Sequence, residues 1–284
     1  MTRINKKKKV NEFFRALPRY IFYIITAIIL ILPFFWMLST SFKLDIEIFT
    51  FPIQWLPSSL YLGNYKRALE IMPVLKNIMN TTFVGVLKLL GEVLVSALVA
   101  YGFARFEFKF KKAIFMVLIA SLMLPYEVTM IPTFIMWSKL GFADSYVPLI
   151  LPSLFGSASF IFFFRMYFST FPSELEDAML IDGANRFQIF YLLYLPLSKA
   201  ALITVTVWSF LGTWNDLLGP LIYLNDSNKY TVQLSLAAFS NMTGETLWGP
   251  LMAANVMVLT PILILYLLAQ NYFIDGVRAG SIKG

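Results

Sequence analysis

The chain has 284 residues, of which 58% are hydrophobic and 14% charged, and its formal net charge is +7. Soluble domains are about half apolar and about a quarter charged, so this composition indicates an integral membrane protein. The sequence contains no Cys and no His, which excludes disulfides and thiolate metal sites and disfavours most hydrolases and zinc enzymes. We interpret the positive charge as a mark of the cytoplasmic side and of contact with anionic membrane lipid, and not as a nucleic-acid site.

Six stretches are long and apolar enough to cross a bilayer, which takes about 20 residues. They are residues 20–40, 80–104, 113–135, 146–168, 200–224 and 247–273. We therefore predict an all-α polytopic membrane protein with a basic N-terminal segment (1–19), a six-helix transmembrane domain (20–274) and a C-terminal tail (275–284). The first stretch is too long for the apolar part of a signal peptide.

Lys and Arg set the expected orientation. With a cytoplasmic N-terminus, sixteen of them fall on the cytoplasmic side, counting Arg165 near the end of the fourth span, and six fall on the opposite side; Lys88 lies within the second span. The excess of positive charge predicts that both termini are cytoplasmic. Residues 42–76 would then lie outside; Pro52 and Pro57 predict an extended piece, followed by a short amphipathic helix around Asn64–Met72.

Charged residues inside spans are costly and point by default to function. Lys88 and Glu92 lie four residues apart on one face of the second span, where they can pair. The pair either pins helix packing or contacts a substrate. Glu127 sits between Pro125 and Pro132 in the third span; it either lines a water-filled path or lies near the outer boundary.

The stretch SELEDAMLIDGANRF (173–187) interrupts the apolar chain with four carboxylates. We call residues 172–196 the acidic loop. Ser173 and Glu176 have the spacing of a capping box at a helix start. Asp182-Gly183 fits a helix end with glycine in the left-handed conformation. Asn185 is placed to cap a second helix.

Pro196 is expected to kink or end that second helix near the membrane. The acidic loop therefore predicts a helix, a glycine turn and a helix across the cytoplasmic mouth. A helix that rests on anionic lipid is normally rich in Lys and Arg, whereas this one is acidic. Docking into a basic groove of another protein is therefore favoured over a linker that rests on lipid headgroups.

The fifth span contains TWNDLLGPLIY, in which Trp214, Asn215 and Asp216 precede a predicted helix break at Gly219-Pro220. Aromatic faces and a few polar groups in an apolar cleft are what a small polar ligand such as a sugar requires. The alternative is an aromatic belt at the outer end of the span. Asn255 in the sixth span is a further candidate for the substrate path.

The segment EDAMLIDGANRFQIFYLLYLP resembles the cytoplasmic loop signature of bacterial ABC importer permeases, which reads E-A-A-x-x-x-G, nine residues, then I-x-L-P. The matching positions are Asp177, Ala178, Met179, Gly183, Leu193, Leu195 and Pro196. Asp177 stands where the family often has Glu, and Met179 stands where it has Ala. Because Asp is one methylene shorter, Glu174 or Glu176 can share its role.

Six further blocks extend the resemblance along the chain: NYKRAL, AYGFARFEFKFKK, LPYEVTMIPTFIMWSKLGFADSY, FLGTWNDLLGPLIYL, YTVQLSLAAF and YFIDGVRAGSIKG. They are similar to the carbohydrate branch, and within it to the second membrane subunit of the maltose importer type (MalG-like). The resemblance implies the type I ABC importer permease fold in the bacterial cytoplasmic membrane. It also implies a function as half of the ATP-driven translocation path for a sugar or oligosaccharide.

The expected partners are a second homologous permease, two ABC ATPases and an extracytoplasmic sugar-binding protein. ATP and Mg would bind in the ATPases, and this chain, which has no Walker A glycine loop, is expected to bind no cofactor or metal and to be no enzyme. The acidic loop would be the coupling helix, and the tail RAGSIKG either reaches the ATPases or is disordered. The residues expected to couple to the ATPase are Glu174, Glu176, Asp177, Ala178, Met179, Asp182, Gly183, Arg186, Leu195 and Pro196.

Three alternatives remain open at this point. One is an ABC permease for a polyamine or peptide. A second is an ion-driven secondary transporter, which predicts inverted repeats that the sequence does not display. A third is a membrane enzyme, which the absence of a catalytic constellation disfavours.

Overall fold

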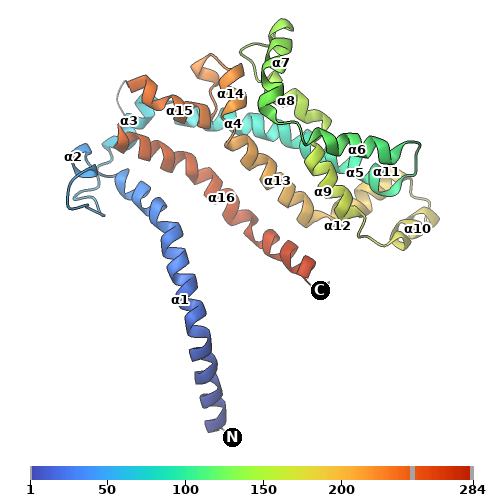
Figure 1. Cartoon of the computed structure of the whole chain (residues 1–284), viewed down its shortest axis with the longest axis horizontal. Coiled ribbons are helices and arrows are strands. Elements are labelled where there is room, and N and C mark those ends of the chain that lie inside the picture. The colour runs from blue at the N-terminus through green and yellow to red at the C-terminus, as the bar shows by residue number, and fades with distance from the viewer. Residues whose placement is uncertain (1, 244–246, 282–284) are drawn as a thin grey trace. The chain divides into compact units, whose positions relative to one another are not determined.

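The computed structural model describes residues 2–243 and 247–281, with side chains for residues 16–239 and 247–270. Every regular element in these ranges is a helix, as the fold class predicts (Figure 1). The chain forms two compact units. Unit 1 comprises residues 1–72 and 239–257, and unit 2 comprises residues 73–238 and 258–284. The last three residues of the predicted tail lie outside the described residues.

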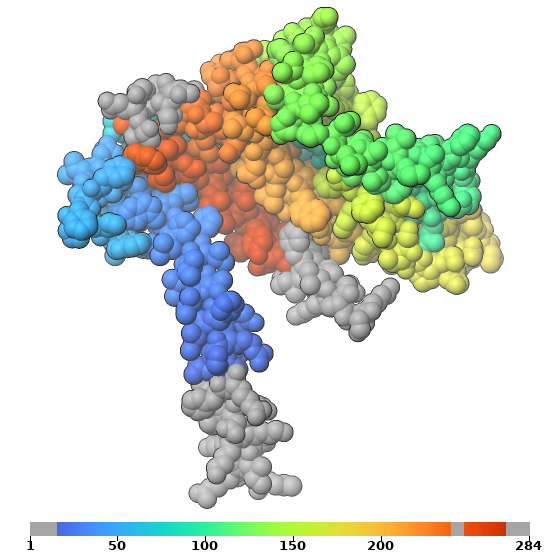
Figure 2. All heavy atoms as spheres, in the orientation of Figure 1, coloured from blue at the N-terminus to red at the C-terminus, as the bar shows by residue number. Residues whose placement is uncertain are grey.

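Unit 1 contains α1 (Thr2–Thr40), α2 (Asp45–Ile48), α3 (Gly63–Ile71), the end of α15 (Val232–Thr243) and the start of α16 (Trp248–Ser281). Within the apolar part of α1, Ala16–Thr40, an 18-residue window with a mean hydropathy of 2.6 has none of its residues buried inside the chain. Its Ile, Phe and Tyr side chains are exposed along the helix, which is the blue segment in Figure 2. A surface of this kind is suited to a bilayer.

The extended piece after α1 is fixed by one buried cation. Lys43 is fully buried; its Nζ donates to the Gln54 carbonyl at 2.5 Å and lies 3.9 Å from the ring centroid of Trp36. The side-chain amide of Asn64, in α3, donates through Nδ2 to the backbone carbonyls of Ser41 and Lys43 at 3.1 and 2.7 Å. Burial lowers the pKa of Lys43 from its ordinary value. The predicted extended piece and short helix are both present.

Unit 2 contains most of the predicted membrane domain. Its helices are α4 (Val74–Leu89), η1 (Leu90–Val95), α5 (Ser96–Arg105), α6 (Lys111–Ser121), α7 (Tyr126–Lys139), α8 (Val147–Ile150), η2 (Leu151–Phe155), α9 (Ala158–Phe168), α10 (Ser173–Ile181), α11 (Arg186–Ile189), η3 (Phe190–Tyr194), α12 (Leu195–Leu197), α13 (Lys199–Trp214), α14 (Leu218–Tyr223) and η4 (Ser227–Lys229), with the start of α15 and the end of α16. The segments η1 and η3 are π-helical, and η2 and η4 are 3₁₀-helical.

The six predicted spans correspond to four long apolar helical stretches and two bent pairs in the described residues. The third span was predicted as one helix, but α6 and α7 meet at 93°. Pro125 precedes α7 in extended conformation, and proline disfavours helical geometry in the residue before it. The fifth span ends at Trp214 and not at residue 224, and an 80° bend separates its helix α13 from the segment Arg186–Leu197.

The core of unit 2 forms where α5 packs against α9, with α13 nearby (Figure 1). Residues of η3 and α13 complete this core. Ala97 and Ala100 of α5 are fully buried, as are Phe164 and Phe168 of α9. Small residues on one membrane helix let the backbone of the next approach closely, which is how such helices associate without a hydrophobic driving force from lipid. The core thus fixes α5 and α9, whose ends lie next to the acidic loop.

Gly91 in η1 marks a close approach between two backbones in this unit. A Cβ at this position would overlap the backbone of Ser153 and Leu154 in η2. Because backbone atoms cannot move aside as a flexible side chain can, this contact requires glycine.

We predict that Gly91→Ala destabilises the protein by about 1–3 kcal/mol, the range observed for overpacked cores. Gly212→Ala is the matched control, because a Cβ on Gly212 in α13 has nothing within 4 Å. Thermal unfolding in detergent measures both. A Gly91→Ala protein as stable as Gly212→Ala would show that η1 and η2 are not in close contact.

Candidate functional site

The acidic loop is attached to the core of unit 2 through one buried carboxylate. Glu176 of α10 is only 5% exposed. Its Oε1 is paired with the guanidinium of Arg186, and its Oε2 accepts a hydrogen bond from the Tyr194 hydroxyl at 2.9 Å. The Nε of Arg105, at the end of α5, lies 3.6 Å from the same Oε2. Glu176 therefore joins α10 to α5, α11 and η3.

Arg105 also holds the chain that leads into the loop. Its guanidinium donates to the backbone carbonyls of Phe168 at 3.1 Å and Phe171 at 2.5 Å. Phe168 is the last residue of α9 and Phe171 lies three residues beyond it, in the region where backbone acceptors lack partners within the helix. A single arginine thus satisfies the end of α9 and contacts the carboxylate of the next helix.

The predicted capping box at Ser173 and Glu176 is wrong. The helix begins after Pro172, and no side chain caps its first turn. The spacing of Ser173 and Glu176 is also compatible with a Glu176 side chain that points toward the core. There, two guanidinium groups attract the carboxylate more strongly than a backbone amide can. Sequence reasoning missed Arg105 and Tyr194; a signal for Arg105 was available in its position at the end of an apolar span.

The turn after α10 agrees with the prediction. Gly183 has φ +83°, in the left-handed region, with open space where a Cβ would lie. Asn185 caps α11: its Oδ1 accepts from the Gln188 amide at 2.9 Å, and Gln188 Oε1 accepts from the Asn185 amide at 2.7 Å. The direction of the chain after α10 is therefore set by local bonds.

The other residues predicted to couple to an ATPase divide by exposure. Glu174, Asp177, Ala178, Asp182, Gly183, Arg186 and Pro196 are exposed, whereas Met179 and Leu195 are half-buried against the core. Leu175 and Ile181 of α10 are also exposed, the latter at 86%. The open face of α10 therefore combines acidic, small and apolar side chains.

We predict that Glu176→Gln weakens the attachment of the loop because it leaves two arginines without their carboxylate. Breaking one partner of a buried ion pair costs about 3–5 kcal/mol. Glu174→Gln is the control, because Glu174 is exposed on the same helix. Limited proteolysis of the loop and thermal unfolding should both distinguish the variants. Equal behaviour of the two would exclude Glu176 as the anchor.

A second candidate site is a cavity of about 380 Å³ in unit 2, which we call the polar cavity. Its lining comes from α4, α7, α8, η2, α14 and the turn between α13 and α14. It consists of Lys88, Tyr126, Thr129, Thr133, Trp137, Pro148, Leu149, Pro152, Asp216, Gly219 and Tyr223. Of the residues predicted for the substrate path, Asp216 lies here. Its Oδ1 accepts from the Gly219 amide at 3.1 Å.

Lys88 and Glu92 form the predicted intramembrane pair. Their Nζ and Oε1 atoms are 4.0 Å apart, and each side chain is 17% exposed. The Ser209 hydroxyl of α13 donates to Glu92 Oε2 at 2.5 Å. The pair therefore connects α4 and η1 to α13, and Lys88 in addition reaches the polar cavity.

The remaining substrate-path candidates lie outside the polar cavity. Trp214 is buried and packs on Phe210 with ring centroids 5.4 Å apart. Asn215 and Asn255 donate to carbonyls of their own helices, at 2.9 and 2.8 Å. Glu127 is exposed. Sequence reasoning missed Tyr126, Trp137 and Tyr223, which share the polar cavity only because α7 and α14 fold against one another.

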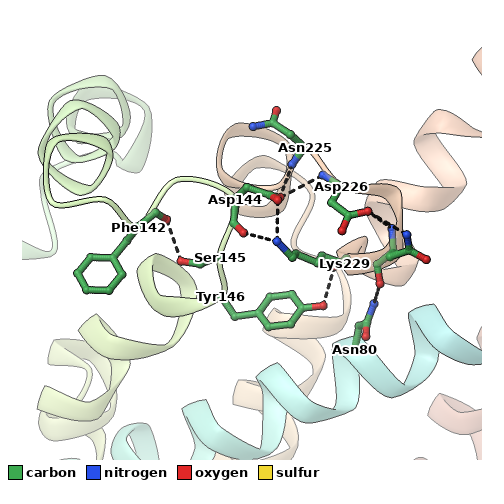
Figure 3. A network of polar contacts seen from close by, with 9 residues as sticks. Asn80, Phe142, Asp144, Ser145, Tyr146, Asn225, Asp226 and Lys229 are labelled. Atoms are coloured by element: carbon green, nitrogen blue, oxygen red, sulfur yellow. Dashed lines mark hydrogen bonds and ion pairs between the residues drawn. The ribbon is translucent and has the colours of Figure 1, made fainter.

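A polar network around Asp144 ties the loop after α7 to the loop after α14 (Figure 3). We call it the Asp144 clasp. Its Oδ1 accepts from the amides of Asn225 at 2.9 Å and Asp226 at 3.1 Å, and its Oδ2 lies 2.6 Å from Lys229 Nζ. The Asp144 amide donates to the carbonyl of Tyr223 at 3.0 Å. The clasp therefore holds Tyr223, one wall of the polar cavity.

Lys229 and the backbone amides lower the pKa of Asp144 to about 2, from an ordinary value of 3.8. A depressed folded pKa contributes stability that is complete above about pH 4 and lost as the pH falls toward 2. We predict that protection of the Asn225 and Asp226 amides in hydrogen exchange decreases over this interval. Asp144→Asn should show weaker protection with no such pH dependence; the same pH profile in both proteins would contradict the assignment.

Residues 92–279 match the model of the family described as "Binding-protein-dependent transport system inner membrane component". A probable ABC transporter permease of Bacillus subtilis, YurM, is 34% identical over 93% of this chain and 88% of its own length. The chain belongs to this family. It is therefore a membrane-integral transporter permease.

Two further similarities concern substrate and fold. The arabinooligosaccharides transport system permease protein AraQ of Halalkalibacterium halodurans is 33% identical over 72% of this permease and 73% of its own length. A solved bacterial ABC transporter, described as involved in the import of the acidic polysaccharide alginate, has a TM-score of 0.77 at 22% identity. The match covers 93% of this permease and 98% of the solved chain and confirms the ABC importer permease fold.

Proposed function

We propose that this permease forms half of the translocation path of an ATP-driven importer for a sugar or oligosaccharide. The observation that carries the proposal is that α10 has one exposed face while Glu176 anchors the helix to the core of unit 2. Family membership supports the role, and AraQ, named for arabinooligosaccharides, supports a sugar substrate.

The partners in this proposal are a second homologous permease, two ABC ATPases and an extracytoplasmic sugar-binding protein. ATP and Mg bind in the ATPases. The N-terminus and the C-terminus face the cytoplasm, as the distribution of Lys and Arg supports, so the acidic loop faces the ATPases. One basic ATPase groove receives α10 through Asp177, Ala178 and Leu175, which are exposed.

Movement passes through the anchored loop. When ATP closes the ATPases, α10 moves with its groove, and the ion pairs of Glu176 with Arg105 and Arg186 transmit the movement to α5 and α11. The permease then changes between outward-open and inward-open states, a two-state equilibrium that ATP and the loaded binding protein bias.

The test is reconstitution of the complex with its binding protein in liposomes. We expect uptake of a radiolabelled neutral oligosaccharide that requires ATP and the binding protein. Asp177→Lys should abolish co-purification of the ATPase and reduce uptake at least tenfold, because it places a cation against a basic groove. Glu70→Lys, an equal charge change on an exposed residue of α3, should leave co-purification of the ATPase intact.

Other outcomes would favour the alternatives. ATP hydrolysis stimulated by a polyamine or a peptide, with no response to sugars, would indicate a different solute. Uptake by the permease alone, driven by an ion gradient, would indicate a secondary transporter. Unchanged ATPase co-purification in Asp177→Lys would refute the docking role of α10.

A further inference from the structure

The charges around the polar cavity bear on the class of sugar that it accepts, and this inference rests on the proposed function. Lys88 is the one cation and Asp216 the one anion among the lining residues. The ammonium of Lys88 already faces Glu92, and Ser209 holds that carboxylate in place. The positive charge on the wall of the cavity is therefore largely neutralised from within the chain.

Asp216 has no comparable partner. Within the residues that the structure describes, its carboxylate is in no ion pair and accepts one hydrogen bond, from the Gly219 amide. A Cβ on Gly219 would lie 2.7 Å from Asp216 Oδ2, so this glycine leaves room for the carboxylate at the wall. The side chain is half-buried and retains acceptor capacity, since a carboxylate has about four lone-pair sites.

The rest of the lining suits a sugar ring. Trp137, Tyr126 and Tyr223 supply aromatic surface. The Tyr223 hydroxyl donates to Thr133 Oγ1 at 3.3 Å, a long bond that a competing hydroxyl can replace. The volume of about 380 Å³ lies within the range of small-ligand pockets.

We propose that the polar cavity binds an uncharged sugar unit, whose hydroxyls donate to Asp216, and that it disfavours uronates and sugar phosphates. An acidic sugar would bring a second negative charge close to Asp216 in a site of reduced dielectric, where like charges repel strongly. The similar proteins do not distinguish neutral from acidic sugars as the substrate, because AraQ is named for arabinooligosaccharides and the solved relative is described as importing the acidic alginate. The charges of the cavity do separate them.

The experiment measures binding to the permeases apart from the selectivity of the binding protein. The complex of both permeases and the ATPases is purified without the binding protein. Saturation-transfer NMR, which detects weak ligands, is recorded with arabinotriose and maltotriose as neutral probes and with trigalacturonate as the acidic probe. Co-purification of all subunits serves as the measure of correct folding and assembly.

We expect at least one neutral probe to bind the wild-type complex and trigalacturonate to bind at least tenfold more weakly. Asp216→Asn should weaken binding of the neutral probe about tenfold, the loss expected for hydrogen bonds to a charged acceptor. The same variant should strengthen binding of trigalacturonate, an opposite change that misfolding cannot produce. Glu107→Gln, which removes an exposed carboxylate outside the cavity, should change neither.

Trigalacturonate binding as tight as that of the neutral probes would overturn the inference. Asp216→Asn without effect on any probe would do the same, and both results would leave ATP-driven sugar uptake, and hence the proposed function, untouched. Failure of the reconstituted complex to import any sugar would overturn the proposed function itself.

Discussion

The carboxylate of Glu176 lies where four elements of unit 2 meet, α10, α5, α11 and η3, and the position of the acidic loop depends on it. Two guanidinium groups and a phenol surround it, from Arg186, Arg105 and Tyr194. Such a cluster adds little net stability compared with apolar packing, but it is costly to break and accepts only one geometry. An apolar contact would allow α10 to slide over the core. The ion pairs instead give α10 one orientation, which any partner that binds its open face must meet.

The same principle recurs through unit 2, where polar groups of one helix are satisfied from a distant part of the chain. Glu92 is bonded by Ser209, and Thr81 Oγ1 accepts from the Val232 amide at 2.9 Å. Asp144 binds two amides and a lysine more than 80 positions later. Helices in a bilayer gain little from hydrophobic burial against one another, so such bonds and close packing of small residues determine which helices are neighbours. The polar cavity is enclosed by helices held in this way.

Hydropathy and local chemistry predicted much of this arrangement, because they depend on neighbours in sequence. The apolar stretches, the left-handed Gly183 and the Asn185 cap are present as expected. The break between α6 and α7 was missed because residues 122–125 are as apolar as the helices they separate. The direction of the Glu176 side chain and the set of residues that line the polar cavity were missed for another reason. Both depend on residues far apart in sequence, and no single-chain pattern records which helices pack together.

The π-helical segment η3 explains why spacing, and not only composition, characterises the acidic loop. It lies between α11 and α12 and ends at Tyr194, the residue that bonds Glu176. A π-helical turn contains one residue more than an α-helical turn. The extra residue of η3 can be absorbed or lost within that turn, but α11 has none to spare. A residue deleted from α11 would rotate all that follows by about 100° relative to α10, and Tyr194 would leave Glu176. Insertions and deletions between Gly183 and Ile189 should therefore be far rarer in natural relatives than substitutions at the exposed positions of the same segment.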